Sequence, residues 1–152
     1  LDHIGICFLI AGSATPVMVF SCSWKGPAVL WALMILTMVA KAVGGCLDNI
    51  WLHVASFVLG PSLACWMAWE PMQRALRPWQ LDFIWAAGAF YVGGLFPWGL
   101  RDLKFHVAIW HVCVILGSAS IFAIVYYAVD TPDKVAELEA TLSQCFRDDV
   151  YG

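Results

Sequence analysis

Long apolar runs without any Asp, Glu, Lys or Arg constrain the fold of this 152-residue chain more than any other feature. Four of them cover residues 3–24, 49–69, 83–100 and 105–129, and a shorter fifth covers 26–40. A helix needs about 20 predominantly apolar residues to cross a bilayer, so the four long runs qualify. The fifth qualifies if it continues past Lys41, whose side chain can reach the interface.

The composition excludes several classes of protein. Hydrophobic residues make up 62% of the chain and charged residues 12%, whereas soluble domains average roughly 45–50% and about 25%. This balance excludes a soluble enzyme, a disordered chain and a nucleic-acid binder. The runs are continuous and lack the period-two alternation of barrel strands, so they predict an all-α integral membrane protein.

The runs and the prolines between them predict the domain organisation. We expect a transmembrane domain over 1–129 and an acidic extramembrane tail over 130–152. Within the domain, five spanning helices are predicted near 1–22, 27–45, 50–69, 79–99 and 105–129. Pro16 and Pro61 fall inside spans, where a proline kinks the helix. Tryptophans near the run ends are typical of interface belts; they are Trp24, Trp51, Trp69, Trp79 and Trp98.

The tail predicts a short amphipathic helix. Thr131-Pro132-Asp133 combines an N-cap, a proline at the first helical position and an early acid. Val135, Leu138 and Leu142 then recur at helical spacing. Two alternatives stay open, a solvated tail of weak helicity and a helix that docks on the bundle or on a partner.

The cysteines and the first residues suggest neither a disulfide framework nor a leader peptide. The six cysteines show no regular spacing, so we expect free thiols and no cysteine zinc site. The first apolar run begins at once, without a basic region or cleavage site, so it is not a signal peptide. A chain that opens at the edge of a span is expected to be the C-terminal part of a larger protein.

The polar residues within the spans are predicted to gather toward one membrane face. Short loops make consecutive helices alternate in direction, which places Asp2, His3, His53, His106 and His111 on the same face and Asp82 on the opposite one. Ionisable groups inside a bilayer are costly and commonly functional. Histidines near a carboxylate suit a zinc site, in which the carboxylate orients the metal-bound water.

Depth in the membrane and spacing along the helix distinguish the candidate zinc-binding histidines. His3 and His53 lie at interface depth, where a lone histidine is common, while His111 lies deeper among apolar residues. His106 and His111 are five residues apart, roughly 140° around an α-helix. They share a face only if the helix contains a π-bulge. The alternative is that these histidines are structural.

Two segments resemble the hemolysin III / progestin and adipoQ receptor (adiponectin receptor-like) family. Leu1-Asp2-His3-Ile4-Gly5-Ile6, continuing to Pro16, is similar to the third-helix motif of that family. Ala108-Ile109-Trp110-His111-Val112 and Val114-Ile115-Leu116-Gly117-Ser118 resemble its last helix, and residues 87–93 its penultimate helix. The resemblance implies that the chain corresponds to the last five helices of a seven-helix bundle, with the face bearing Asp2 in the cytosol. Basic residues are divided equally between the two predicted faces, with three on each before the tail.

The resemblance also implies a zinc site. Asp2 matches the aspartate that holds the metal-bound water, and His111 matches the second histidine of an H-x-x-x-H pair. The first histidine of that pair falls on Val107, with His106 one position earlier. A further histidine of bacterial members falls on Ile121. The remaining His and Ser of the family site belong to its second helix, upstream of Leu1.

The implied activity is zinc-dependent hydrolysis of a lipid amide or ester, as in a ceramidase, with Asp2 catalytic and His111 and His106 binding zinc. The alternative is a non-enzymatic protein, either receptor-like with an extracellular ligand or membrane-perturbing like a hemolysin, whose metal site is degenerate. Membrane lipids are the expected partners in both cases.

Overall fold

The structure is a computed structural model that describes residues 2–44, 54–100 and 102–151, and every element within these ranges is a helix. The prediction of an all-α chain is confirmed. In chain order the elements are α1 (Asp2–Phe20), α2 (Lys25–Gly44), the π-helix η1 (Ala55–Leu59), α4 (Gly60–Ala75), α5 (Pro78–Gly99), α6 (His106–Val129) and α7 (Pro132–Tyr151).

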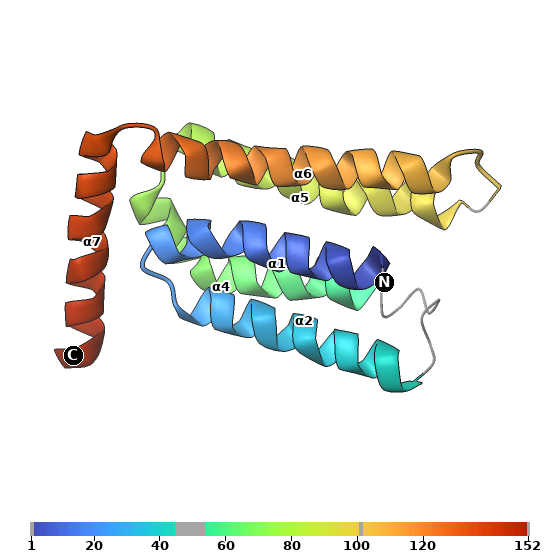
Figure 1. Ribbon diagram of the computed structural model, residues 1–152, viewed down its shortest axis with the longest axis horizontal. Helices are drawn as coiled ribbons and strands as arrows, with labels where there is room; N and C mark the ends of the chain where they lie inside the picture. Colours follow the sequence, from blue (N-terminus) through green and yellow to red (C-terminus); the bar gives the residue numbers. More distant parts are fainter. Residues whose placement is uncertain (1, 45–53, 101, 152) are drawn as a thin grey trace.

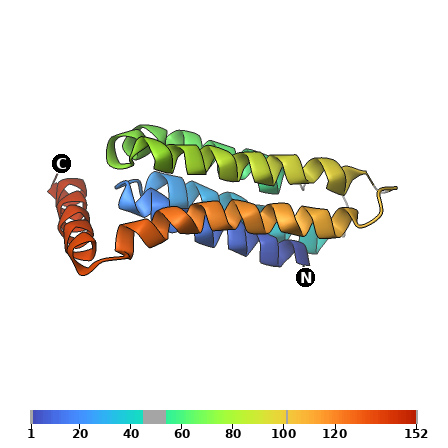
Figure 2. The same cartoon turned by 90° about the horizontal axis from the view of Figure 1, so that it is seen from above.

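The helices form an elongated bundle with α7 across one end (Figure 1). In one group α1, α2 and α4 pack together, and the α5–α6 hairpin lies against this group mainly through α6 on α1. Figure 2 shows the same long helices from above, with α7 set beyond the end of the bundle. The start of α1 lies at the end of the bundle that carries the α5–α6 turn.

One helix meets the length and hydropathy expected of a membrane span within the described residues. It is α6, and two shorter apolar helices cover Ile4–Phe20 and Lys25–Ala40. Five spans therefore stay a prediction.

The proline at position 61 changes the local helix geometry. A proline has no N–H to donate to the carbonyl four residues earlier, so the regular ladder is interrupted at that point. The preceding turn, η1, is a π-helix, and α4 begins directly after it at Gly60. Pro16, by contrast, lies inside the continuous helix α1.

Large apolar side chains fill the interior where the groups meet. Trp110 of α6 is buried and packs against Phe57 of η1, with ring centroids 5.6 Å apart. On the other side of the bundle, Trp31 of α2 donates its indole N–H to Thr15 Oγ1 of α1 at 3.0 Å. The core therefore combines apolar packing with a few polar links between helices.

The expectation of free cysteines is wrong for two of them. Cys22, in the turn after α1, forms a disulfide with Cys145 of α7, with Cα atoms 5.7 Å apart. Cys7, Cys65 and Cys113 are not disulfide-bonded, and Cys46 lies outside the described residues. The two bonded cysteines are 123 residues apart in sequence, so only the position of α7 across the bundle end brings them together.

Of the two alternatives for the tail, the structure has the docked helix. α7 begins at Pro132, as the N-cap pattern predicts, and Val135, Leu138 and Leu142 are half-buried.

Candidate functional site

The end of the bundle that carries the α5–α6 turn brings together the starts of α1 and α6 (Figure 1). This arrangement agrees with the alternation of helix directions expected from the sequence. Asp2 is the first residue of α1 and His106 the first of α6. The side chains of Asp2 and His3 lie outside the described part of the structure, as does the whole of His53. Asp82 lies near the start of α5, at the opposite end.

His111 and His106 are both held through the same ring nitrogen. Nδ1–H of His111 donates to the carbonyl of Val107 at 2.7 Å, and Nδ1–H of His106 donates to the carbonyl of Leu103 at 3.0 Å. A carbonyl can only accept, so a neutral ring in this position carries its proton on Nδ1 and its lone pair on Nε2. Metal-binding histidines are commonly oriented in this way.

The two imidazoles do not share a face of α6. The helix is α-helical from His106 to Val129, and the π-helix lies instead in η1. Five residues of a regular α-helix turn the side chains roughly 140° apart, so one metal ion can bind both only if the first turn of α6 rearranges. No three His, Cys, Asp or Glu residues cluster around a potential metal position in the described part of the chain. Zinc binding by His111 and His106, with Asp2 beside the metal, stays a prediction.

A second candidate site is an apolar cavity of about 410 Å³ between α4 and α5. These consecutive helices barely touch, and α1, η1 and α6 close the cavity from behind. Its lining is almost entirely apolar, and the volume lies in the range of roughly 300–1,000 Å³ typical of small-molecule sites. Its lining includes Phe57 of η1, Trp69 of α4, and Trp85, Gly88 and Tyr91 of α5.

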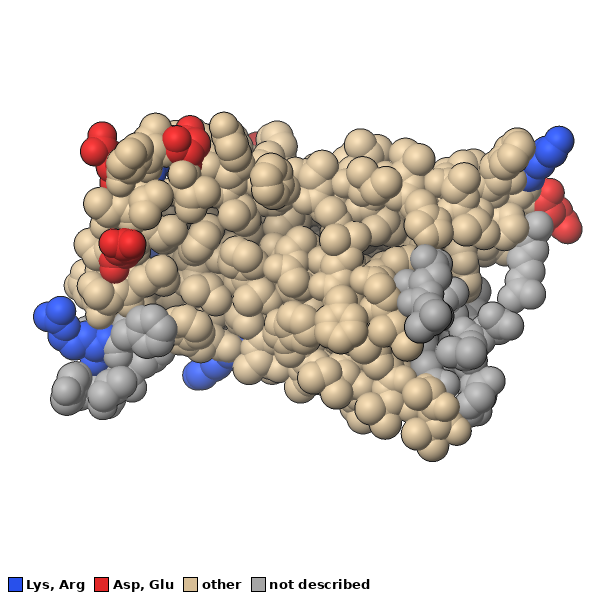
Figure 3. Space-filling view, viewed as in Figure 1, with Lys and Arg blue, Asp and Glu red and all other residues tan. Residues whose placement is uncertain are grey.

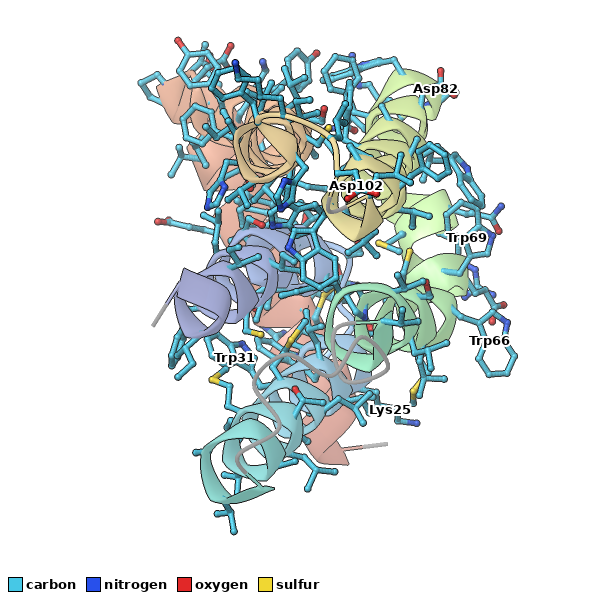
Figure 4. The ribbon with its side chains drawn as sticks, turned by 90° about the vertical axis from the view of Figure 1, so that its right-hand side faces the viewer. Lys25, Trp31, Trp66, Trp69, Asp82 and Asp102 are labelled. Atoms are coloured by element: carbon cyan, nitrogen blue, oxygen red, sulfur yellow. A yellow bond between two sulfur atoms is a disulfide. The ribbon has the colours of Figure 1, made fainter. Side chains whose placement is uncertain are left out.

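Tryptophans mark the outer edge of this cavity. Trp69 of α4 meets Trp85 of α5 edge-to-face, with ring centroids 5.4 Å apart. Trp66, also of α4, is 75% exposed. Looking along the bundle, Figure 4 shows Trp66 and Trp69 projecting from α4 on its outer side. The cavity is therefore lateral, and a pair of aromatic rings bridges the two helices beside it.

Two of the few polar groups in the lining, the hydroxyls of Tyr91 and Ser13, already make hydrogen bonds within the protein. Tyr91 and Ser118 share a hydrogen bond of 3.0 Å between α5 and α6, and Ser13 Oγ donates to the carbonyl of Ile10 in its own helix. The cavity consequently suits an apolar group better than a polar one. The sequence does not predict this site, because Trp69 fits an interface belt equally well and chain order does not indicate that α4 and α5 lie apart.

The outer surface of the bundle is apolar along its length. Large apolar side chains on several helices are between 63% and 83% exposed; they include Val43, Phe96, Phe122 and Ile115. On the face in Figure 3, charged side chains gather near the two ends, and other residues cover the length between them. Soluble monomers rarely expose contiguous apolar patches larger than a few hundred Å².

Two curated bacterial proteins are similar to this chain. Hemolysin-3 of Bacillus cereus is 30% identical over 144 residues, which is 86% of this chain and 61% of that protein. A Hemolysin-3 homolog of Bacillus subtilis (strain 168) is 27% identical over 141 residues, 87% of this chain and 63% of the relative. The chain thus spans about three fifths of the length of these relatives. No family model matches the chain, and no solved structure matches it. The similarity runs over most of the chain in both relatives, and the chain belongs to the hemolysin III family.

Proposed function

We propose that this hemolysin III protein is a multi-pass integral membrane protein that accommodates a lipid acyl chain in the cavity between α4 and α5. The apolar outer surface supports the membrane location, since a bilayer would cover it without exposing charge. Each long helix of the bundle then crosses the bilayer, and α7 lies outside it.

The lateral position and apolar lining of the cavity carry the proposal. A cavity that faces the hydrocarbon region can take a lipid tail directly from the bilayer, and the tail needs no hydrogen-bonding partner there. Phe57 and Tyr91 provide broad apolar surfaces within the cavity, while Trp69 and Trp85 stand beside its opening.

Two glycines of α5 provide a matched test of lipid binding. Gly88 lines the cavity and Gly93 does not, and a Cβ added at either position would meet nothing within 4 Å. We expect Gly88→Leu to reduce labelling of the purified protein by a photoreactive fatty acid about tenfold, equivalent to about 1.4 kcal/mol of binding free energy. Gly93→Leu should label like the wild type. Equal labelling of both variants would contradict binding in this cavity.

We further propose that the end of the bundle bearing His111 is a zinc site of a membrane hydrolase acting on a lipid amide or ester. Support comes from the family resemblance at Asp2 and His111 and from the Nδ1–H bond that leaves the His111 lone pair on Nε2. When bound, zinc would supply a water whose pKa falls to about 7. His111 would bind the metal with His106 after a local rearrangement, and Asp2 would orient the water. Membership of the wider progestin and adipoQ receptor family belongs to this proposal.

Metal content tests the zinc proposal without relying on activity. The full-length protein, purified in detergent, should contain about one zinc, and His111→Ala should remove most of it. Asp82→Asn, at the other end of the bundle, is the control and should leave the zinc content unchanged. Unchanged zinc in His111→Ala would exclude this assignment.

The names of the relatives suggest a second function, perturbation of membranes. Leakage of a fluorescent dye from phosphatidylcholine vesicles separates the two activities. A membrane-perturbing protein should release the dye in the presence of a zinc chelator, whereas a hydrolase should lose its activity when the metal is removed.

A further inference from the structure

Helix α7 crosses the end of the bundle remote from His111, and it is attached there at two places. About 20 residues of α-helix extend roughly 30 Å, and α7 has that length. In Figure 1 it turns away from the direction of α6 and runs across the bundle end. Its half-buried apolar residues, described above, recur on one side of the helix.

The first attachment is a cluster around Tyr127 near the end of α6. Lys134 Nζ of α7 lies 3.6 Å from the centroid of the Tyr127 ring and donates to Asp130 Oδ1 at 2.7 Å. Arg77, in the turn between α4 and α5, donates from Nη1 to Tyr127 Oη at 2.9 Å. Trp79 of α5 meets the same ring edge-to-face. The first turn of α7 is therefore tied to the α5–α6 hairpin and its preceding turn.

The second attachment is the disulfide from Cys145 to Cys22, in the turn between α1 and α2. This turn closes α1 with a Schellman motif: the N–H of Ser23 donates to the carbonyl of Met18 at 3.0 Å, and the N–H of Cys22 to that of Val19 at 2.9 Å. Cys22 occupies the left-handed position of the motif, with φ of 57°. Glycine is the usual residue there, because a side chain is unfavourable in this conformation.

A cysteine at a position that favours glycine is explained by its bond to α7. The first attachment belongs to the α5–α6 hairpin and the second to the α1–α2–α4 group, while the lateral cavity lies between α4 and α5 of these two groups. We propose that α7 is a redox-controlled strap. With the disulfide formed it holds the two groups together, and with the disulfide reduced it lets α4 and α5 pivot apart about the two-residue turn that joins them, which widens the cavity.

The chemistry is thiol–disulfide exchange. The two thiols of Cys22 and Cys145 react with an external disulfide R–S–S–R, forming the Cys22–Cys145 bond and releasing two R–SH; an excess of a reducing dithiol reverses the exchange. Disulfides persist in oxidising compartments, so the strap requires this end of the bundle to face away from the cytosol. The proposal concerns helix spacing and holds whether or not the cavity takes a lipid.

The test measures the bond and the spacing separately in the full chain, reconstituted in phosphatidylcholine vesicles. Mass spectrometry of unreduced peptides should detect the Cys22–Cys145 linkage and lose it after dithiothreitol. Spin labels carried on non-cysteine unnatural amino acids at Leu63 of α4 and Phe90 of α5, both exposed and outside the cavity lining, report the distance between these helices. Reduction should shift the distance distribution to longer values and broaden it.

Substitutions distinguish the effect of losing the Cys22–Cys145 disulfide from the effect of altering the turn at Cys22. Cys145→Ser and Cys22→Gly should both reproduce the reduced distribution without any reductant, although glycine suits the left-handed turn better than cysteine. Cys113→Ser removes a free thiol and should behave as the wild type. Absence of the linked peptide would overturn the proposal, as would a distance that does not respond to reduction or that changes in Cys22→Gly alone.

Discussion

The two pairs of consecutive helices α5–α6 and α4–α5 differ in how closely they pack. At two glycines, side chains of one helix of the α5–α6 pair pack directly against the backbone of the other. A Cβ at Gly94 would lie 2.7 Å from Cys113 Cβ, and one at Gly117 would lie 2.9 Å from the Tyr91 ring. Between α4 and α5, tryptophans face the gap and the helices diverge.

The segment that connects α4 to α5 also contributes to the difference in packing between the two helix pairs. The link from α4 to α5 consists of Leu76 and Arg77, both with extended backbone, and Pro78 begins the next helix. A residue before proline is restricted to extended conformations, and Gln80 Oε1 accepts the Arg77 N–H at 2.8 Å. Glycines thus let side chains of one helix pack closely on the other in the α5–α6 pair, whereas tryptophans lie between α4 and α5. Shared chain order therefore does not decide which helices pack.

Removing the largest fully buried side chain of the α5–α6 pair should have the largest effect on stability. Trp110 is 2% exposed and contacts both Phe57 and the region of Gly94. We expect Trp110→Ala to lower the free energy of unfolding by about 3–5 kcal/mol, measured in detergent by circular dichroism during denaturant titration. Trp66→Ala, on the open side, is the control. A comparable loss in both variants would remove the contrast between the two helix pairs.

Alanine substitutions at two adjacent glycines of α5 should change the free energy of unfolding in opposite directions. In Gly94→Ala the new methyl group collides with Cys113 and Trp110, so we expect a loss of about 1–3 kcal/mol. In Gly93→Ala it meets open space, and the better helix propensity of alanine should raise stability by up to about 1 kcal/mol. The same unfolding titration checks both, and stabilisation by Gly94→Ala would show that α5 and α6 are not in close contact.

The smallest effect is expected from the polar link inside the closed pair. Tyr91→Phe removes the hydrogen bond with Ser118 but keeps the ring against Gly117, and should cost about 0.5–1.5 kcal/mol. Tyr126→Phe on the exposed side of α6 is the control. If the hydroxyl contributes through this bond, adding Ser118→Ala to Tyr91→Phe should lower stability little further.

Much of the fold could be predicted from the sequence, because local sequence patterns indicate where helices lie and where they begin. The charge-free runs correspond to the long helices, the Thr131-Pro132 pattern marks the start of α7, and alternation of direction places His106 and the start of α1 at one end. The helix boundaries differ by a few residues, since Pro61 and the π-helix before it alter the third segment.

The candidate sites were less predictable. His106 and His111 were identifiable as residues, but their Nδ1–H bonds depend on the course of the backbone from Leu103 onward. The lateral cavity and the Cys22–Cys145 bond have no local signal, because each joins residues that lie far apart in the chain.

The sequence by itself determined the helical class, the apolar surface suited to a membrane, the hemolysin III similarity and the end of the bundle to which the histidines belong. Only the tertiary structure decided that α5 closes on α6 but not on α4, that a lateral cavity results, and that α7 returns to the turn after α1. The physical reason is range: hydropathy and helix signals act over one or two turns, whereas close approach, cavities and disulfides depend on how separate helices meet.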